Sequence, residues 1–253
     1  MPVVIQITDT HLFANPHATI AGVDTNQSLQ AVLNQVREQE PRIDLVIATG
    51  DLAHDESPDT YQRLANMLAD LGAPVLYLPG NHDNPIILED TLLAAPHNDV
   101  FEARLQGWRF LLLDTSVSGC VGGRVSGTAL ESLRASLERG PSLPTLIAMH
   151  HHPTPVGSLW MDNIGLENGP DFLRLLRNAP DVKGVIFGHT HQRFEHTLGE
   201  IRIMGTPSTC FQFKPDSETL VYDNLGPAYR RLELTQDGII NTCVQYIENH
   251  SAR

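Results

Sequence analysis

Residues 147–153 read IAMHHHP, an apolar run that ends abruptly at three consecutive histidines. A short apolar run bounded by polar residues is typical of a buried strand, and the proline at position 153 favours an end to regular strand pairing. Strand geometry itself gives no reason for three histidines at this point. Two questions follow: which of the three histidines has a function, and whether other strands of the chain end in the same way.

Four other apolar runs end at similar polar residues. The polar segments are TDTH at 8–11, GDLAHD at 50–55, GNHD at 80–83 and GHTH at 188–191, beside MHHH at 149–152. In open α/β sheets the carboxyl ends of the strands line one crevice. Five separate stretches of the chain are therefore expected to deliver Asp, Asn and His side chains to one place.

The whole chain alternates short apolar runs with amphipathic stretches, which predicts an α/β fold. The predicted strands are VVIQIT, LVIAT, VLYLP, FLLL, LIAM and VIF. Helices are predicted around 29–36, over 57–71 after a Ser-Pro start, and from Thr128, which has Glu131 at capping-box spacing. From about residue 192 the pieces RFEHTL, IRIMG, YRRLEL and TCVQYI predict antiparallel strands that finish a second sheet.

Length and composition narrow the class of protein. A chain of 253 residues with 41% hydrophobic and 19% charged residues is expected to form one domain over residues 1–253. It has no apolar run of about 18 residues, and its start lacks a signal-peptide pattern, so we expect a soluble cytoplasmic protein without a membrane partner. A net charge of −13 without clusters of Lys and Arg argues against a nucleic-acid partner.

The cysteines, Cys120, Cys210 and Cys243, are too few and too widely spaced for a zinc cage or a disulfide framework. We predict three buried or half-buried thiols. Ligands are expected instead from Asp, Asn and His, whose oxygen and nitrogen atoms suit Mn, Fe, Co or Zn. There are more such donors than one ion can use, which predicts two metal ions. Two neighbouring ions activate water and stabilise displacement at phosphorus, as in many phosphatases and nucleases.

Each motif has a simpler explanation when it is taken alone. An Asp after a strand often forms a turn or caps a helix, GNHD suits a turn, and His pairs are usually surface residues. The order of the motifs and their common position after strands argue for function. Five histidines are predicted to be ordinary surface or packing residues: His17, His54, His97, His196 and His250.

In this order, D-x-H, G-D, G-N-H-D, a strand-end His and G-H-x-H resemble the calcineurin-like metallophosphoesterase superfamily. Within it, QITDTHLF, HHHP and GTPSTCFQFKP followed by GPAYRRLEL resemble the bacterial class III 3′,5′-cyclic-AMP phosphodiesterases. The resemblance implies a four-layer αββα sandwich with two mixed β-sheets and a dinuclear metal site at their carboxyl edge. It implies Asp9, His11 and His191 on one ion, Asn81, His150 and His189 on the other, and Asp51 bridging both.

The function that this resemblance implies is the metal-dependent hydrolysis of 3′,5′-cyclic AMP to 5′-AMP, with two ions drawn from Fe, Mn, Co and Zn. His82, the residue after Asn81, is implied to contact the scissile phosphate and to assist the departing 3′-oxygen without binding a metal. The expected partner is therefore a small cyclic nucleotide. Two alternatives stay open: hydrolysis of another small phosphate ester, such as a glycerophosphodiester, and a non-catalytic binding module of the same fold.

Within the triplet, strand alternation gives a partial answer. If the strand continued through Met149, residues 150 and 152 would face one way and His151 the other, so alternation cannot choose between His150 and His152. The resemblance places the ligand at the first histidine, which is His150. For His151, a role beside the ligands or the substrate and a purely local turn role both stay open.

Overall fold

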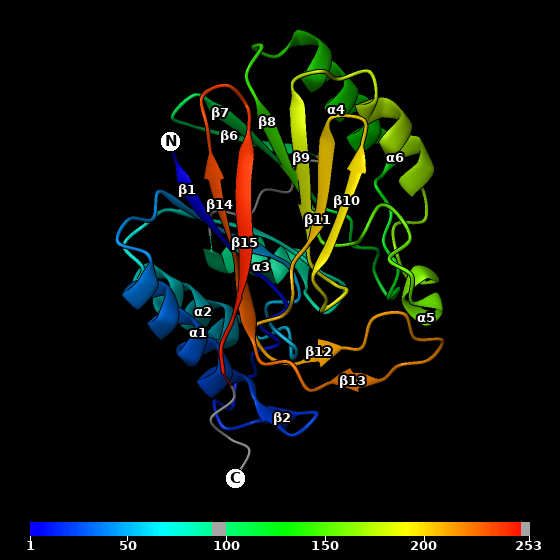
Figure 1. Ribbon diagram of the computed structural model, residues 1–253. Coiled ribbons are helices and arrows are strands. Elements are labelled where there is room, and N and C mark those ends of the chain that lie inside the picture. The colour runs from blue at the N-terminus through cyan, green and yellow to red at the C-terminus, as the bar shows by residue number, and fades with distance from the viewer. Residues whose placement is uncertain (93–99, 249–253) are drawn as a thin grey trace.

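The computed structural model describes residues 1–92 and 100–248 and contains two large mixed β-sheets packed face to face (Figure 1). The strand order is β15-β14-β1-β4-β5 in the first sheet and β10-β11-β9-β8-β7-β6 in the second. Helices α1, α2 and α3 cover the outer face of the first sheet, and α4, α5 and α6 cover the outer face of the second. The predicted four-layer αββα sandwich is confirmed.

The first sheet has a parallel centre and an antiparallel edge. Its parallel strands are β1 (Val3–Ile7), β4 (Leu45–Thr49) and β5 (Val75–Leu78), and its antiparallel strands are β14 (Ala228–Leu234) and β15 (Ile240–Tyr246). The covering helices are α1 (Thr25–Gln39), α2 (Pro58–Ala69) and α3 (Pro85–Leu92). A small hairpin of β2 (Thr19–Ile20) and β3 (Val23–Asp24) precedes α1.

The second sheet has four parallel strands between two antiparallel edge strands. The parallel strands are β7 (Trp108–Leu113), β8 (Thr145–Ala148), β9 (Val182–Phe187) and β11 (Ile201–Gly205), and the edges are β6 (Val100–Leu105) and β10 (Phe194–Leu198). Its helices are α4 (Gly127–Arg139), α5 (Leu159–Asp162) and α6 (Gly169–Leu176). A second small hairpin joins β12 (Gln212–Phe213) to β13 (Tyr222–Asp223).

Alternation along the strands builds the layers. In β1, Val4 packs between the two sheets and Ile5 packs against the helices. In β8, Leu146 lies in the same inter-sheet core and Ile147 faces the helices of the other side. Because both faces of these strands are buried, their sequences are continuously apolar rather than alternating.

The prediction for the last part of the chain is half wrong. The pieces after residue 192 do form strands, but only β10 and β11 join the second sheet, and β11 runs parallel to β9. The chain then returns to the first sheet, where β14 pairs with β1 and β15 pairs with β14. The edge of β1 that β4 leaves free would otherwise present unpaired backbone groups, and β14 satisfies them.

The helix boundaries were predicted with mixed success. Ser57 caps α2 and Pro58 is its first residue, as predicted. For α4 the predicted start at Thr128 is wrong, because Ser126 is the N-cap and its side chain accepts a hydrogen bond from the backbone of Ala129 at 2.9 Å. A Ser two residues earlier thus takes the capping role that the Thr128 and Glu131 spacing suggested.

The cysteines are all free, as predicted, and Cys210 is buried and Cys243 half-buried. The prediction fails at Cys120, which is exposed. Across residues 1–92 and 100–248, none of the helices has both the length and the apolar character needed to span a membrane. His17 and His196 are exposed, as predicted, and His97 and His250 lie outside the described residues.

Candidate metal centre

The five polar segments meet where the carboxyl ends of the parallel strands adjoin. β1, β4 and β5 of the first sheet lead to the segments at 8–11, 50–55 and 80–83, and β8 and β9 of the second lead to those at 149–152 and 188–191. Because the sheets pack face to face, these edges lie beside each other. The predicted convergence of Asp, Asn and His side chains is therefore what the fold produces.

Asp9, His11 and His191 form the first group of donors. His191 Nε2 lies 3.4 Å from Asp9 Oδ1 and 3.3 Å from His11 Nε2. All three residues are buried. Their ligand atoms lie close enough to hold one metal ion together.

Asn81, His150 and His189 form the second group. His150 Nε2 lies 3.2 Å from Asn81 Oδ1. The rings of His150 and His189 have centroids 5.1 Å apart, and one nitrogen of each lies within 4.8 Å of the other. This arrangement offers one amide oxygen and two imidazole nitrogens to a second ion.

Asp51 lies between the two groups with one oxygen toward each. Oδ2 is 3.7 Å from His11 Nε2, and Oδ1 is 3.4 Å from His150 Nε2. Burial disfavours the ionised carboxylate, but His150 first, and then His11 and His82, hold the pKa of Asp51 well below its usual range. For His150 burial acts the opposite way, and Asp51 outweighs it and raises the pKa of His150 to about 9. The charge that favours a proton on His150 Nε2 equally favours a cation there.

Backbone carbonyls fix which nitrogen of each ring faces the centre. His150 Nδ1 lies 2.8 Å from the carbonyl oxygen of Thr49, and His191 Nδ1 lies 2.7 Å from that of Phe211. A carbonyl oxygen only accepts, so each Nδ1 carries a proton and Nε2 is the nitrogen available to a cation. Such outer hydrogen bonds orient metal-binding histidines in general.

His189 uses the opposite nitrogen. Its Nε2 donates to the carbonyl oxygen of Ile164 over 3.1 Å, which leaves the Nδ1 lone pair free for the centre. Burial, and then the neighbouring histidines, lower the pKa of His189 well below its usual value, and burial lowers that of His11 to about 3. Two neutral imidazoles cannot satisfy each other's lone pairs, whereas a cation between them would accept both and would also be attracted by the ionised Asp51 carboxylate. The donor set therefore fits divalent metal ions.

Five of the predicted ligands have left-handed backbone. The φ angles are 51° for Asp9, 43° for His11, 52° for Asp51, 64° for His189 and 49° for His191. Residues other than glycine seldom adopt this region, at a cost of about 1–3 kcal/mol each, and they do so mainly at functional sites. The surrounding sheets hold this strained backbone, which turns each side chain sharply out of the strand direction.

The glycines of the motifs make room for the ligands. A Cβ atom at Gly80 would lie 2.2 Å from Asp51 Oδ1, and one at Gly50 would lie 2.5 Å from His150 Nδ1. Both distances are far below contact distance, and the neighbouring groups are buried. The glycines of GD and GNHD are thus part of the site because only a hydrogen fits against the ligands.

Strand alternation does not apply to the three histidines, because β8 ends at Ala148. Their side-chain contacts show instead which of them faces the donor groups. His151 lies near the second group, but both its ring nitrogens are already engaged. Nδ1 is 2.7 Å from the Thr115 hydroxyl, and Nε2 donates to the carbonyl oxygen of Val121 over 3.1 Å. Of the two roles left open for His151, the ring contacts with His150 at 4.9 Å and with His189 at 4.7 Å fit the role beside the predicted ligands.

His152 lies behind the second group of donors. Its ring stacks on that of His189 at a centroid distance of 5.7 Å, and its Nε2 is 3.9 Å from Asp162 Oδ1. His150 is therefore the member of the triplet that faces Asp51 and Asn81.

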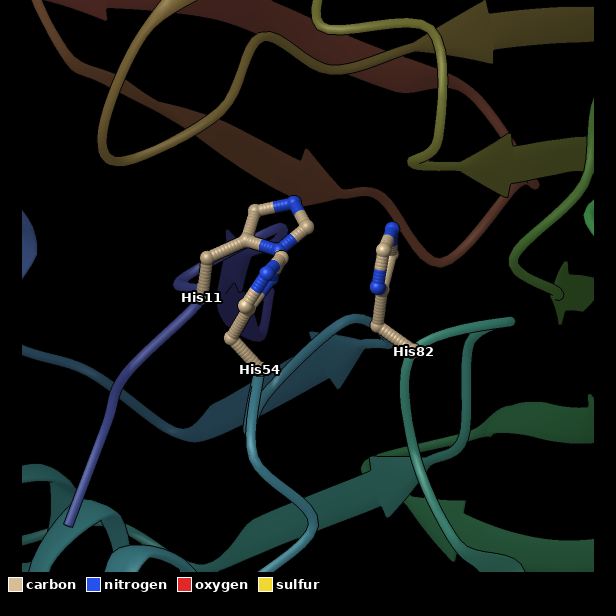
Figure 2. A group of neighbouring side chains, drawn as sticks. All are labelled: His11, His54 and His82. Carbon is tan, nitrogen blue, oxygen red and sulfur yellow. The ribbon is translucent and has the colours of Figure 1, made fainter. Parts of the chain in front are cut away.

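His82 stands at the open side of the centre and lines a cavity of about 240 Å³. Its ring lies 5.0 Å from that of His11 and stacks at 4.8 Å on that of His54 (Figure 2). His54, predicted to be an ordinary surface or packing residue, does pack against these rings, and its Nδ1 also lies 3.2 Å from His11 Nδ1, a contact that was not predicted. Its place three residues after Asp51, in GDLAHD, was the sequence signal that could have found it.

Asp83, the last residue of GNHD, was also missed. Its carboxylate accepts hydrogen bonds from the backbone of Leu52, Ala53 and Gly80, and from the Tyr61 hydroxyl. Burial, and then the charge of Asp51, raise the pKa of Asp83 to about 6. Asp83 therefore ties the GNHD loop to the backbone that carries Asp51.

The outer wall of the cavity is apolar and rich in aromatic rings, a feature that the sequence motifs did not indicate. Phe211 and Phe213 have rings 4.7 and 4.6 Å from that of His191. Tyr222 of the β12–β13 hairpin lies 5.3 Å from Phe211, and Trp160 of α5 lies 4.9 Å from Phe213. The complete apolar lining is Ile20, Val121, Trp160, Met161, Ile164, Phe211, Phe213, Leu220 and Tyr222.

Comparison with known proteins agrees with this geometry. Residues 2–193 match the family described as calcineurin-like phosphoesterase. The chain is 38% identical over 248 residues to the 3′,5′-cyclic adenosine monophosphate phosphodiesterase CpdA of Pseudomonas aeruginosa, covering 97% of this chain and 90% of that one. It is 41% identical over 242 residues to the protein of the same name from Escherichia coli K12, covering 94% and 87%.

Among solved structures, the fold is similar to that of a dimetal phosphatase from Danio rerio, with a TM-score of 0.66. The sequence identity is 18%, and the match covers 91% of this chain and 94% of the other. At this identity the similarity concerns the fold.

The change Gly80→Ala is expected to displace Asp51, because the added Cβ would lie 2.2 Å from its carboxylate and 2.4 Å from its backbone nitrogen. We expect the free energy of unfolding to fall by about 1–3 kcal/mol and the Mn²⁺ content to fall with it, measured by denaturant titration and elemental analysis. Gly127→Ala is the control, since a Cβ there meets nothing within 4 Å. Wild-type stability and metal content in Gly80→Ala would show that the close approach of Gly80 to Asp51 is not needed for the site.

Proposed function

The chain belongs to the calcineurin-like phosphoesterase family, and from that premise we propose that it is a metal-dependent phosphodiesterase that hydrolyses 3′,5′-cyclic AMP to 5′-AMP. The observation that supports this most strongly is the pair of donor groups that share Asp51 beside His82 and an aromatic cavity. The names of the relatives from Pseudomonas aeruginosa and Escherichia coli supply the substrate.

The proposed metal ligands follow the two donor groups of the structure. Bound divalent ions supply Lewis acidity toward the phosphoryl oxygens and a nucleophile derived from water. We assign Asp9, His11 and His191 to one ion, Asn81, His150 and His189 to the other, and Asp51 to both. The nitrogen and oxygen donors suit Mn, Fe, Co or Zn, because none of these seven residues offers a thiolate. The nearby thiol of Cys210 is buried, which raises its pKa to about 12 and keeps it protonated.

His82 is proposed as the acid that assists the leaving group. Its backbone N–H donates to Asp51 over 2.8 Å, which holds the residue at the centre, while its ring lines the cavity. The His82 ring belongs to neither donor group, so it can reach the substrate. Departure of the ribose 3′-oxygen needs a proton, since an alkoxide is a poor leaving group, and a positioned imidazolium supplies one.

The aromatic wall is proposed to hold the base of the substrate. Stacking on aromatic side chains binds nucleobases through their faces. The polar lining of the cavity is confined to the donor groups and to His54 and His82. Tyr222 and Trp160 pack on Phe211 and Phe213, whose rings contact that of His191. A nucleotide with its phosphate at the donors would place its base toward these rings.

Two alternatives are tested by the same experiments. Another small phosphate ester would use the donor groups but would not need the aromatic wall. A non-catalytic module would need no metal, which does not fit a complete and convergent donor set.

We also propose a cytoplasmic location, because Cys120, Cys210 and Cys243 are all free and Cys120 is exposed, as is typical of a reducing compartment.

Chelation is expected to abolish hydrolysis of cyclic AMP, and Mn²⁺ or Co²⁺ to restore it, because oxygen and nitrogen donors release their ions to a strong chelator. The measurement is turnover of cyclic AMP, cyclic GMP, a glycerophosphodiester and a phosphate monoester by the metal-free and reconstituted protein. Full activity after metal removal would contradict the metal-dependent mechanism. Faster turnover of the glycerophosphodiester than of the cyclic nucleotides would favour the first alternative.

His82→Ala is expected to keep both ions and to slow hydrolysis of cyclic AMP by roughly 10²–10⁴-fold, the range for loss of a positioned acid. The loss should be much smaller with bis(p-nitrophenyl) phosphate, whose phenolate departs without a proton. The readouts are kcat on the two substrates and metal content. Equal losses on both substrates would mean that His82 stabilises phosphoryl charge instead, and a lost ion would make it a ligand.

Tyr222→Ala is expected to raise KM for cyclic AMP by about 5- to 30-fold, the weaker part of the range for base stacking, because this ring is half exposed. The same change should leave the abasic 3′,5′-cyclic ribose phosphate unaffected, since that substrate has no base to stack. Val221→Ala is the matched control, because Val221 is exposed on the same hairpin and does not line the cavity. Equal effects on both substrates would show that Tyr222 acts on the hairpin rather than on the base.

A further inference from the structure

The ligand histidines each have an outer hydrogen-bond partner, and that of His11 differs from the rest. His150, His189 and His191 donate to backbone carbonyl oxygens. His11 Nδ1 instead faces a side chain, His54 Nδ1, at 3.2 Å. Within the described part of the chain, His54 is thus the outer contact of a ligand histidine that a substitution can remove without touching the backbone.

We propose that His54 is a positioning residue, which accepts a hydrogen bond from His11 Nδ1 and keeps the His82 ring beside the metal centre. The inference rests on the metal centre proposed above. If His11 binds its ion through Nε2, a neutral His11 carries its proton on Nδ1. The facing nitrogen of His54 must then be the acceptor, so His54 has its own proton on Nε2.

The backbone holds His54 firmly in this place. The N–H of His54 donates to the carbonyl oxygen of Leu12 over 2.7 Å, and the N–H of His11 donates to that of Asp51 over 2.9 Å. Leu12 and Ala53 also form an isolated parallel bridge. The two loops that carry His11 and His54 are therefore bound together on both sides of the ring contact.

Stacking fixes the His54 ring itself. It packs at 4.8 Å on the ring of Phe13 and at 4.8 Å, nearly parallel, on that of His82. Figure 2 shows His54 and His82 rising from neighbouring loops toward His11. The His54 ring thus contacts both the proposed ligand His11 and the proposed acid His82. A shift of the His54 ring would therefore move both.

The alternative is that His11, His54 and His82 bind a further cation, since their nitrogens lie within 4.8 Å of one another. His11 makes this less suitable, because its Nε2 already converges with His191 and its carboxylate neighbours. A ring that gives one nitrogen to an ion keeps the other protonated. The hydrogen bond to His54 uses that proton, whereas a further ion would require its removal.

Two variants separate the hydrogen bond from the stacking. His54→Phe keeps a ring against Phe13 and His82 but removes the acceptor, and His54→Gln keeps an acceptor oxygen but removes the ring. The probe is Mn²⁺ affinity, measured on the metal-free protein by competition with a chelator, together with kcat and KM for cyclic AMP. His196→Ala is the control, because His196 is exposed and lies outside the centre.

We expect His54→Phe to weaken Mn²⁺ binding by about 10- to 100-fold, the range for loss of an outer hydrogen bond to a ligand. His54→Gln should stay within a few-fold of wild type in affinity and should lower kcat rather than raise KM, through the displaced His82. Wild-type affinity in His54→Phe would overturn the inference, as would equal losses in both variants. A third ion per wild-type chain, absent from both variants, would make His54 a ligand and overturn it as well.

A wild-type protein that binds no Mn²⁺ would refute the proposed metal centre instead. Unchanged metal affinity in His54→Phe, on a wild-type protein that binds two ions, would leave that centre intact and refute only the role of His54. The two failures are therefore distinguishable.

Discussion

The buried, ionised carboxylate of Asp51 lies between two sets of histidines and imposes conditions on every loop around it. Asp51 has one oxygen toward His11 and the other toward His150, and these rings come from different sheets. A carboxylate in such a place is costly unless charges and hydrogen bonds compensate it. The neighbouring histidines and the His82 N–H provide that compensation here, and metal ions would provide more.

Placing this group imposes conditions on the surrounding backbone. Five of the seven proposed ligands leave their strands in left-handed conformations, which residues other than glycine seldom adopt. Glycines precede or adjoin them. A Cβ added at Gly50, Gly80 or Gly188 would overlap the side chain of a proposed ligand or of Thr8 beside Asp9. The inter-sheet core and the two helix-facing cores supply the stability that holds such strain. Asp83 joins the two loops of the first sheet by accepting hydrogen bonds from four donors.

Sequence patterns predicted the central strands well and the periphery less well. The run LVIAT became β4 with the same bounds, and the helix predicted around 29–36 is the middle of α1. The last strands were given to one sheet, whereas β14 and β15 complete the other. Short strands carry no signal for which edge they will join, because either edge offers the same hydrogen bonds. The predicted cap of α4 failed for a similar reason, since Ser126 and Thr128 are both good capping residues.

The α/β class, the five strand-end motifs and the types of donor atom follow from the amino-acid pattern, because strand ends and ligand chemistry are local properties. The arrangement of those donors around Asp51 depends on tertiary packing. This packing put the two oxygens of Asp51 toward different groups and engaged both nitrogens of His151 elsewhere. It also brought His54 against His11 and set the aromatic rings of residues 160, 211, 213 and 222 around one cavity. These contacts join segments far apart in the chain, and their geometry depends on how two sheets pack, which no local pattern encodes.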